Sequence, residues 1–348
     1  WKTRAALRSG DWKAVISAVD AMDSAKQDST WIYWKARGQL AGNATTSPAN
    51  TDPVRTEATA ALQSIASVKG FYEQLALEEL GQAITAPAKP EALAPQEKTV
   101  AAQNSGLQRA LKALSLGLRS EGNREWNYTT NLHTPGGMSE RELLAAADLA
   151  CSKQVWDRCI NTSERTKLAI DFDQRFPMPL KDTVLRRTKE IQLDPAYVYG
   201  LIRQESRFIM DAKSVVGAAG LMQVMPATAK WTAKKIGMTN FQPHQITDQE
   251  INVAIGTGYL KLVLDDFDGS MPLAAAAYNA GPSRSRNWRK GPVLEAAIWA
   301  ENIPFNETRD YVKKVLSNTT NYAAIITGQP QSLKARLGTV GPRNSQAP

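Results

Sequence analysis

The sequence predicts an all-α protein, in which a stack of short helices forms a superhelix (solenoid) and a second helical region follows it. Aromatic and small residues recur at helical spacing within roughly the first 175 residues, for example at 12–16 and 31–37. Alanine-rich helices with contacts between large and small side chains are typical of helical-hairpin solenoids. Capping residues and prolines divide the remainder into helices, and no segment shows a convincing strand pattern.

Prolines mark the breaks between the predicted helices. We interpret 42–53 and 86–95 as loops between helices, because their prolines stop any helix. Pro177 and Pro179 restrict the backbone just before the sequence pattern changes, so we place a domain boundary there. The predicted units are a superhelical domain over 1–117, a helical linker domain over 118–176, a third helical domain over 177–330, and a loosely ordered tail over 331–348.

The third domain contains recognisable helix starts. Asp194 can cap a helix whose first residue is Pro195, and we expect this helix to extend through 197–208. The stretch 247–250 offers a capping box for a helix that ends near Phe267. Further helix starts are predicted at Pro226, Pro272, Pro292 and Asn306, the last helix reaching about residue 327.

Composition narrows the classes of function. Hydrophobic residues make up 43% of the 348 positions and charged residues 22%, an ordinary globular composition. The formal net charge of +8 suits an acidic polymer such as nucleic acid, anionic lipid or cell wall, or solubility alone. No run of five or more Lys or Arg residues is present, which argues against a nucleic-acid-binding tail. The sequence contains no run of about 18 or more apolar residues, so it predicts no transmembrane segment.

The two cysteines allow two interpretations. Cys151 and Cys159 are expected to flank the turn of a helical hairpin, where a disulfide can form in an oxidising compartment. Two small buried thiols are the alternative. With only two histidines, and none at ligand spacing, the cysteines do not predict a metal site.

Glu205 stands where a helix is expected to be apolar. In the helix after Pro195, apolar residues at i, i+3 and i+4 define a core-facing stripe, and its next position is Glu205. Burial of a charge is costly, and the negative end of a helix disfavours a carboxylate further. Both effects raise the pKa, as the protonation of a glycosidic oxygen requires. The alternative is an ion pair of Glu205 with Arg203 or Arg207.

Four motifs in order resemble a known family. They are Glu205-Ser206, the stretch GAAGLMQVMP over 217–226, AYNAGP over 277–282, and ENIPFNETRDYV over 301–312. Their order and spacing resemble the soluble lytic transglycosylases, whose catalytic domain is goose-lysozyme-like. The match covers about 177–328, and the helices before it resemble the superhelical and linker regions of that family more loosely. One departure is Ile209-Met210-Asp211, where the family often has Asn-Pro.

The resemblance implies a set of site residues. Glu205 would be the only catalytic acid and base. Ser214 would hydrogen-bond Glu205 or the substrate, and Asn279 would bind an acetamido group. Substrate-binding residues implied in this way are Ser206, Ser214, Gln223, Met225, Tyr278, Asn279, Glu307 and Tyr311. Met222 and Met225 can instead fill gaps in the core, and Glu301 and Arg309 can form a structural ion pair.

The resemblance also implies an activity. It is cleavage of the MurNAc-β-1,4-GlcNAc bond of peptidoglycan with formation of 1,6-anhydro-MurNAc, without metal or other cofactor. The implied location is the periplasm, with outer-membrane association left open. The resemblance further implies a removed signal peptide and a superhelix longer than this one. Cell-envelope protein partners remain open, as do two other functions: a lysozyme-type hydrolase and a catalytically silent wall-binding scaffold.

Overall fold

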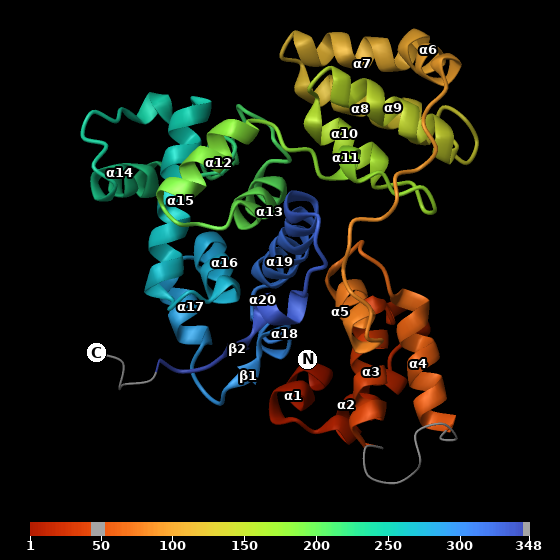
Figure 1. Cartoon of the computed structure of the whole chain (residues 1–348), viewed down its shortest axis with the longest axis vertical. Coiled ribbons are helices and arrows are strands. Elements are labelled where there is room, and N and C mark those ends of the chain that lie inside the picture. The colour runs from red at the N-terminus through yellow and green to blue at the C-terminus, as the bar shows by residue number, and fades with distance from the viewer. Residues whose placement is uncertain (43–52, 344–348) are drawn as a thin grey trace.

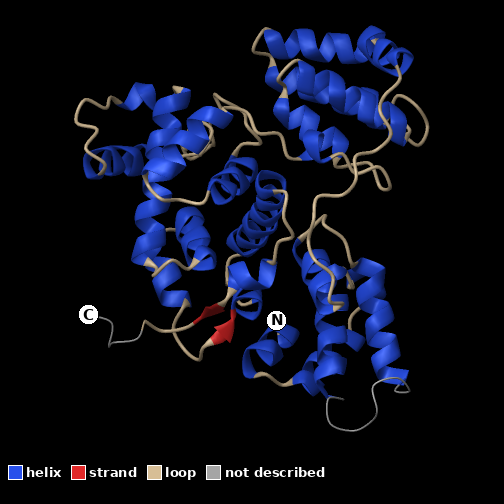
Figure 2. Cartoon of the chain, in the orientation of Figure 1, coloured by secondary structure: helices blue, strands red, loops and turns tan. Residues whose placement is uncertain are grey.

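The computed structural model describes residues 1–42 and 53–343, and within these residues the protein is built almost entirely of helices (Figures 1 and 2). The predicted loop over 42–53 therefore lies almost wholly outside the described residues. No described helix has the length and apolar character needed to cross a membrane. The predicted all-α class with a superhelical part agrees with this architecture.

The first unit packs five helices around aromatic side chains. Trp34 and Tyr33 are fully buried and contact Tyr72, whose hydroxyl accepts a hydrogen bond from Trp34 Nε1 at 3.2 Å. Buried alanines belong to the same hydrophobic core as these rings, which agrees with the large and small residues that the sequence places at helical spacing. The elements are α1 (Lys2–Ser9), α2 (Trp12–Asp20), η1 (Ser24–Lys26), α3 (Ser29–Gly42), α4 (Pro53–Ile65) and α5 (Phe71–Glu79).

The second unit has a hydrophobic core of its own, centred on Trp126, Leu107 and Cys159. Its helices are α6 (Pro95–Gln103), α7 (Ser105–Ser115), α8 (Arg119–Asn131), α9 (Glu140–Ser152) and α10 (Trp156–Ser163), followed by α11 (Phe172–Arg175). A disulfide joins Cys151 to Cys159 across the turn between α9 and α10. Because α6 and α7 contribute to the same core as α8 to α10, we propose that this unit begins near residue 95 instead of 118.

The third unit is built around a helix of 11 residues, α13, which packs against the 22-residue helix α19. Its elements are α12 (Lys181–Glu190), α13 (Pro195–Glu205), α14 (Pro226–Lys235), η2 (Pro243–Thr247), α15 (Gln249–Asp266), α16 (Met271–Ala280), α17 (Pro282–Trp288), β1 (Leu294–Glu295), α18 (Ala296–Glu301), α19 (Asn306–Thr327), α20 (Leu333–Leu337) and β2 (Thr339–Val340). Gly200 of α13 faces α19 so closely that a Cβ there would meet the backbone nitrogen of Thr319 at 2.8 Å. This packing fixes the position of α13, the helix that ends at Glu205.

Three predicted features of the third unit are wrong. Helix α13 ends at Glu205, before the predicted 208, because Arg207 and Phe208 adopt positive φ angles of 48° and 63°. Pro292 starts no helix, since the residues that follow it form β1, which pairs antiparallel with β2. The tail from residue 331 is ordered as far as 343, where α20 and β2 bury Leu333 and Val340.

A buried ionic network joins the first unit to the third. Glu301 is fully buried and accepts hydrogen bonds from Arg4 Nε at 3.0 Å, the Tyr72 hydroxyl at 2.7 Å and Lys313 Nζ at 2.7 Å. The predicted partner Arg309 instead donates to the carbonyl of Ile303. Side chains of the three helices α1, α5 and α19 thus donate to the same carboxylate.

Candidate active site

Side-chain hydrogen bonds at both ends of α13 fix where this helix begins and where it stops. Asp194 Oδ1 accepts from the backbone nitrogen of Ala196 at 2.8 Å, and Pro195 occupies the first turn as predicted. At the other end the Ser206 hydroxyl accepts from the backbone nitrogen of Phe208 at 3.1 Å. The predicted apolar stripe is buried, so the helix presents Glu205 at its last position, partly exposed.

Glu205 has no cationic partner among the described residues. Its Oε1 atom accepts a hydrogen bond of 2.5 Å from the Tyr311 hydroxyl. Burial raises the pKa of Glu205 from 4.5 to about 8, the Tyr311 hydrogen bond lowers it in part, and the negative charge of Glu307 raises it. The carboxyl group is therefore protonated at neutral pH.

The arginines beside Glu205 are occupied elsewhere, which excludes the ion pair considered as an alternative. Arg203 Nη2 donates to Glu164 Oε1 at 2.7 Å, and Arg207 lies 3.5 Å from the same carboxylate. Glu164 belongs to the second unit, so it draws both guanidinium groups away from the end of α13.

Two tyrosines border the Glu205 carboxyl group. Burial raises the pKa of Tyr311 and of Tyr278 well above the ordinary value, and the charge of Glu205 raises both further. Both phenols therefore stay protonated and can donate hydrogen bonds. Tyr278 donates to the carbonyl of Met222 at 2.9 Å, whereas Tyr311 donates to Glu205 itself.

The side-chain amide of Asn279 is oriented by two residues of α19. Its Nδ2 atom donates to Glu307 Oε1 at 3.3 Å, and its Oδ1 atom accepts from the Thr308 hydroxyl at 2.6 Å. Thr308 is buried, whereas Glu307 is exposed. The structure thus brings together two predicted residues, Asn279 and Glu307, with Thr308 as their unpredicted neighbour.

The loop before α14 is held by amide side chains. Gln223, at a positive φ of 44°, donates from Nε2 to the carbonyls of Ala212 and Gly220 at 3.0 and 2.8 Å. Buried Asn252 accepts from the backbone nitrogen of Met222 at 2.8 Å and donates to the carbonyl of Ala219 at 3.0 Å. These bonds define the loop that lies between Glu205 and α14.

The remaining predicted residues occupy different positions. Ser214 Oγ accepts from the backbone nitrogen of Ala218 at 2.9 Å, within its own loop, so its predicted contact with substrate stays a prediction. Met225 is 41% exposed, whereas Met222 is fully buried and fills the core. Met225 is therefore the methionine of the pair that is free to contact a ligand.

Sequence reasoning missed Asn252 and Thr308, and it did not foresee that Tyr311 donates to Glu205. A buried asparagine in α15 breaks an otherwise apolar face, and this signal could have identified Asn252. Thr308 carries no comparable signal, because its partner Asn279 lies 29 residues away. Among the described residues, no group of three or more His, Cys, Asp or Glu side chains could hold a metal ion.

Comparisons with known proteins agree with this arrangement. Residues 182–296 match the family model described as the transglycosylase SLT domain, and residues 302–331 match the soluble lytic transglycosylase helical domain. The chain is 31% identical over 344 residues to the soluble lytic murein transglycosylase of Escherichia coli K12, which covers 96% of this chain and 50% of that relative.

Two solved structures have the same fold. Lytic transglycosylase Slt from Pseudomonas aeruginosa, solved as an inactive mutant, superposes with a TM-score of 0.81 at 32% identity, covering 96% of this chain and 52% of that one. The 70-kDa soluble lytic transglycosylase of Escherichia coli superposes with a TM-score of 0.77 at 29% identity, covering 97% and 53%. The chain spans about half the length of the curated relatives it matches. It carries a match to the transglycosylase SLT domain over residues 182–296 and is similar along most of its length to soluble lytic transglycosylases.

Proposed function

We propose that the chain is a peptidoglycan lytic transglycosylase, which cleaves the β-1,4 bond between N-acetylmuramic acid and N-acetylglucosamine. The observation that carries the proposal is the state of Glu205. Its carboxyl group is partly exposed at a helix end, has no cationic partner among the described residues, and has a pKa raised to about 8 by burial. A carboxyl group that keeps its proton at neutral pH is suited to general acid catalysis.

In the first step Glu205 donates its proton to the oxygen of the glycosidic bond. Because Tyr311 already donates to Oε1, the acidic proton is expected on Oε2. The bond between C1 and the leaving oxygen breaks, and the acetamido group of the muramic acid sugar stabilises the positive charge at C1.

In the second step the Glu205 carboxylate accepts the proton of the C6 hydroxyl group of the same sugar. The C6 oxygen bonds to C1 and closes a 1,6-anhydro ring, and Glu205 is again protonated. An intramolecular nucleophile has a high effective concentration, which favours it over water. Tyr311 stabilises the transient carboxylate through its hydrogen bond.

The other predicted residues are proposed to bind sugar. Tyr278 and Asn279 would line the site, with the Asn279 amide oriented by Thr308 for an acetamido group. Gln223 has its Nε2 donors engaged, so its carbonyl oxygen would face an N-acetyl sugar, beside the exposed Met225. Ser206 and Ser214 would contribute indirectly to sugar binding. Ser206 would stabilise the turn after α13, and Ser214 would stabilise its own loop.

The comparisons support this proposal without testing it on this chain. The relative from Escherichia coli is named a soluble lytic murein transglycosylase. The matching structure from Pseudomonas aeruginosa is described as an inactive mutant in which a glutamate is replaced by glutamine. A single glutamate with the role proposed for Glu205 is consistent with that description.

The proposed location is the periplasm, where the peptidoglycan substrate lies. The disulfide between Cys151 and Cys159 supports an oxidising compartment. The net charge of +8 suits a polymer that carries carboxylates on its lactyl and peptide groups. Association with the outer membrane or with other envelope proteins is left to direct tests, such as retention of envelope proteins on the immobilised chain.

Mass spectrometry of digested peptidoglycan tests the activity. The parent protein is expected to release fragments with 1,6-anhydro ends, and Glu205→Gln is expected to release none. The matched control is Glu250→Gln, which removes an exposed carboxylate of α15. Reducing ends from the parent would indicate a lysozyme-type hydrolase instead. Intact peptidoglycan after incubation with the parent, or an active Glu205→Gln variant, would contradict the proposed role of Glu205.

A further inference from the structure

Three arginines surround a single carboxylate where the second unit meets the end of α13. Glu164 is the residue directly after α10, and its side chain is 35% exposed. Its Oε1 atom lies 2.7 Å from Arg203 Nη2, and its Oε2 atom lies 3.5 Å from Arg207 Nη2. Burial raises the pKa of Glu164, but the charges of these two arginines and of Arg175 outweigh it, so the pKa lies below the ordinary value. Glu164 is therefore an ionised counter-ion beside the helix that carries Glu205.

The core of the second unit fixes the position of Glu164. Two residues before it, the Thr162 hydroxyl accepts a hydrogen bond of 2.9 Å from Nε1 of the buried Trp126. The backbone nitrogen of Glu164 donates to the Ile160 carbonyl at 2.9 Å, and Cys159 ties the same helix to α9 by the disulfide. The carboxylate is thus positioned by the second unit and not by the helix that ends at Glu205.

The two arginines beside Glu205 depend on Glu164 to different degrees. Arg203 is buried and has other partners, since its Nε atom donates to the Arg175 carbonyl at 2.9 Å and its Nη1 atom to Asn318 Oδ1 at 3.0 Å. The side chain of Arg207 is 45% exposed, and Glu164 is its only ion-pair partner among the described residues. Arg207 is therefore the arginine whose direction depends most on Glu164.

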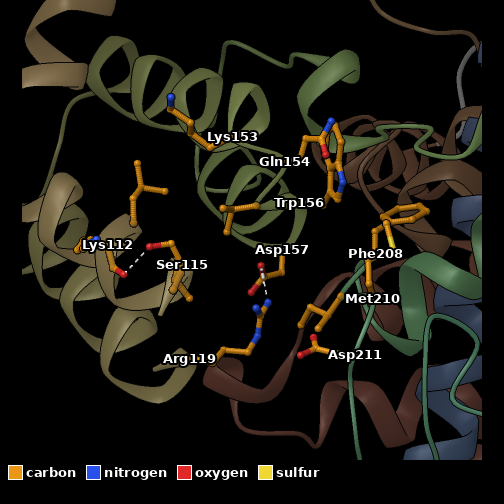
Figure 3. A pocket seen from close by; sticks show the side chains of 14 residues that line it. Lys112, Ser115, Arg119, Lys153, Gln154, Trp156, Asp157, Phe208, Met210 and Asp211 are labelled. Carbon is orange, nitrogen blue, oxygen red and sulfur yellow. Dashed lines mark hydrogen bonds and ion pairs between the residues drawn. The ribbon is translucent and has the colours of Figure 1, made fainter. Parts of the chain in front are cut away.

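The other carboxylate whose charge acts on Arg207 is already occupied. The charges that act on Arg207 come from Glu164, Arg203, Arg158 and Asp157. Asp157 pairs with Arg119 at 2.8 Å (Figure 3) and with Arg158 at 3.1 Å. Because two arginines share it, Asp157 cannot replace Glu164 as a full counter-ion.

The cavity beside this ion pair offers no net negative charge. It has a volume of about 320 Å³, and Glu164, Arg203 and Arg207 form part of its wall. The other charged residues of the wall are Lys69, Lys313, Lys314, Glu73 and Asp310. Since three lysines outnumber two carboxylates, an arginine released from Glu164 would be repelled from this side.

Arg207 stands two residues after Glu205. Successive Cα atoms lie about 3.8 Å apart, so the Cα atoms of these two residues are within about 7.6 Å of each other. An arginine side chain is long enough to close that separation. The groups that face Glu205 in the structure are Tyr311 and Glu307 of α19 and Tyr278 of α16, none of which is a cation. A cation within about 6 Å would favour the ionised carboxylate and remove the acidic proton.

We propose that Glu164 is a positioning residue of the reaction, which holds the guanidinium group of Arg207 on the second unit and so keeps a cation away from Glu205. The inference rests on the proposed function, in which Glu205 must carry a proton. Glu164 acts through Arg207 and needs no contact with the substrate. The second unit thus contributes to the acidity of a residue in the third unit.

The pH profile of kcat/KM tests the proposal. In Glu164→Gln, the release of anhydro fragments is expected to fall at a pH about one unit lower than in the parent, because the released Arg207 stabilises ionised Glu205. Glu164→Gln/Arg207→Gln is expected to restore the parent's profile. A profile of Glu164→Gln that keeps the parent's position on the pH axis, or a shift that persists in the double variant, overturns the proposal.

The matched control is Glu140→Gln. It removes a carboxylate of the same unit that accepts from the backbone nitrogens of residues 167–169. Loss of these hydrogen bonds affects the stability of the second unit, but it releases no arginine near Glu205. The profile of this control is expected to keep the parent's position, and an equal shift in the control would refute the role of Glu164.

A titration separates this proposal from the proposed function. Carbon-13 NMR of the glutamate side chains follows the ionisation of Glu205 directly, and the spectrum of Glu205→Gln identifies its signal. The Glu205 signal is expected to titrate about one pH unit lower in Glu164→Gln than in the parent. An unchanged titration refutes the role of Glu164. Absence of anhydro products from the parent, with the titration shifted as expected, refutes the proposed function instead.

A second variant tests the proposal without an unpaired buried cation. Glu164→Gln removes the carboxylate of buried Arg203, which destabilises the fold. Glu164→Gln/Arg203→Met removes both partners, a change that is often neutral for stability, and leaves Arg207 unpaired. The Glu205 signal is expected to shift in the same direction as in Glu164→Gln. A signal at the parent's pH in this variant, with the fold verified by circular dichroism, overturns the proposal.

Discussion

At the scale of single residues, the chemistry depends on how the surroundings of Glu205 set its charge. Burial is the main cause of the raised pKa, and the other two influences oppose each other: Tyr311 lowers it and Glu307 raises it. Neither neighbour is a general acid in the proposal, yet both change the pH at which the acid is active. The pH profile is therefore the most direct readout of this site.

The general acid must be protonated, so kcat/KM is expected to fall as pH rises through about 8. Glu307→Gln removes a negative charge that raises the pKa, so this fall should move to lower pH. Tyr311→Phe removes a hydrogen bond that lowers the pKa, so the fall should move to higher pH, with a lower maximal rate. The measurement is the rate of release of anhydro fragments between pH 4 and 10. Shifts in the same direction for both variants would contradict this account.

The sequence predicted Glu205 and most of its neighbours, but not the contacts between them. The apolar stripe of α13 is local, so it could be read without a structure. The hydrogen bond from Tyr311 joins residues 106 positions apart, and only the packing of α19 on α13 creates it. The ion pair that removes Arg203 from Glu205 depends on Glu164 in another unit, which no local pattern reveals.

At the scale of elements, the turn after α13 shows how a helix is ended against local preference. Local pattern extends the helix to 208, whereas the structure stops it at Glu205 and places two bulky residues at positive φ. The hydroxyl of Ser206 and the burial of Phe208 stabilise this turn against its strain. The result is a carboxyl group at the last helical position.

Strain at Arg207 can be measured by comparing two variants. Arg207→Gly and Arg207→Ala both lose the weak pair with Glu164 at 3.5 Å. Only alanine retains the cost of a left-handed backbone, about 1–2 kcal/mol. We expect the glycine variant to be more stable than the alanine variant by about 1 kcal/mol in urea denaturation, after allowance for the greater freedom of unfolded glycine. An alanine variant that equals or exceeds it in stability would show that the turn is unstrained.

The disulfide stabilises the α9–α10 hairpin by restricting the unfolded chain. It closes a loop of eight positions, and loop-closure entropy for that length corresponds to about 2–3 kcal/mol. The Cys151→Ala/Cys159→Ala variant is therefore expected to unfold at lower denaturant concentration than the oxidised parent. Adding a reductant should destabilise the parent and leave the variant unchanged. If the reductant destabilises the parent and the variant equally, the disulfide is not the cause of the parent's greater stability.

At the scale of the whole molecule, the first and third units are joined by charges buried around Glu301. The carboxylate is fully buried and binds Arg4, Tyr72 and Lys313, which come from three helices. Burial of such a group is tolerated because each oxygen has a donor. The network couples the first unit to α19, the helix that also supplies Tyr311.

Removal of the central carboxylate should separate the two units. Glu301→Ala removes the shared carboxylate from two partly buried cations, of which Lys313 keeps only Asp310 at 3.6 Å; loss of one partner from a buried ion pair costs about 3–5 kcal/mol. We expect a lower midpoint in thermal denaturation and faster proteolysis between the units. The control is Glu57→Ala, whose carboxylate is 63% exposed and lies 3.8 Å from Lys35, and which should change the stability by less than 0.5 kcal/mol. Equal stability of the two variants would exclude the network as a structural link.

The sequence predicted the all-helical class and the four motifs, because helix starts and motif spacing are local. It did not predict the ordered tail. There the carboxylate of Glu78 accepts from the backbone nitrogens of Leu333 and Lys334 at 3.1 and 3.0 Å, a contact between residues more than 250 positions apart. The second unit was predicted from residue 118 only, because the sequence of α6 and α7 resembles that of the preceding helices and only their packing places them in its core.

The bare backbone at Gly200 has a consequence for the residues that this position can accept. A Cβ at Gly200 would lie 2.8 Å from the backbone nitrogen of Thr319 in α19, five residues and about 7.5 Å of helix before the acid. A methyl group at that point would act as a wedge between the two helices and widen the gap that the phenol of Tyr311 must cross. The hydrogen bond from Tyr311, which lowers the pKa of Glu205 in part, therefore depends on a residue that has no side chain.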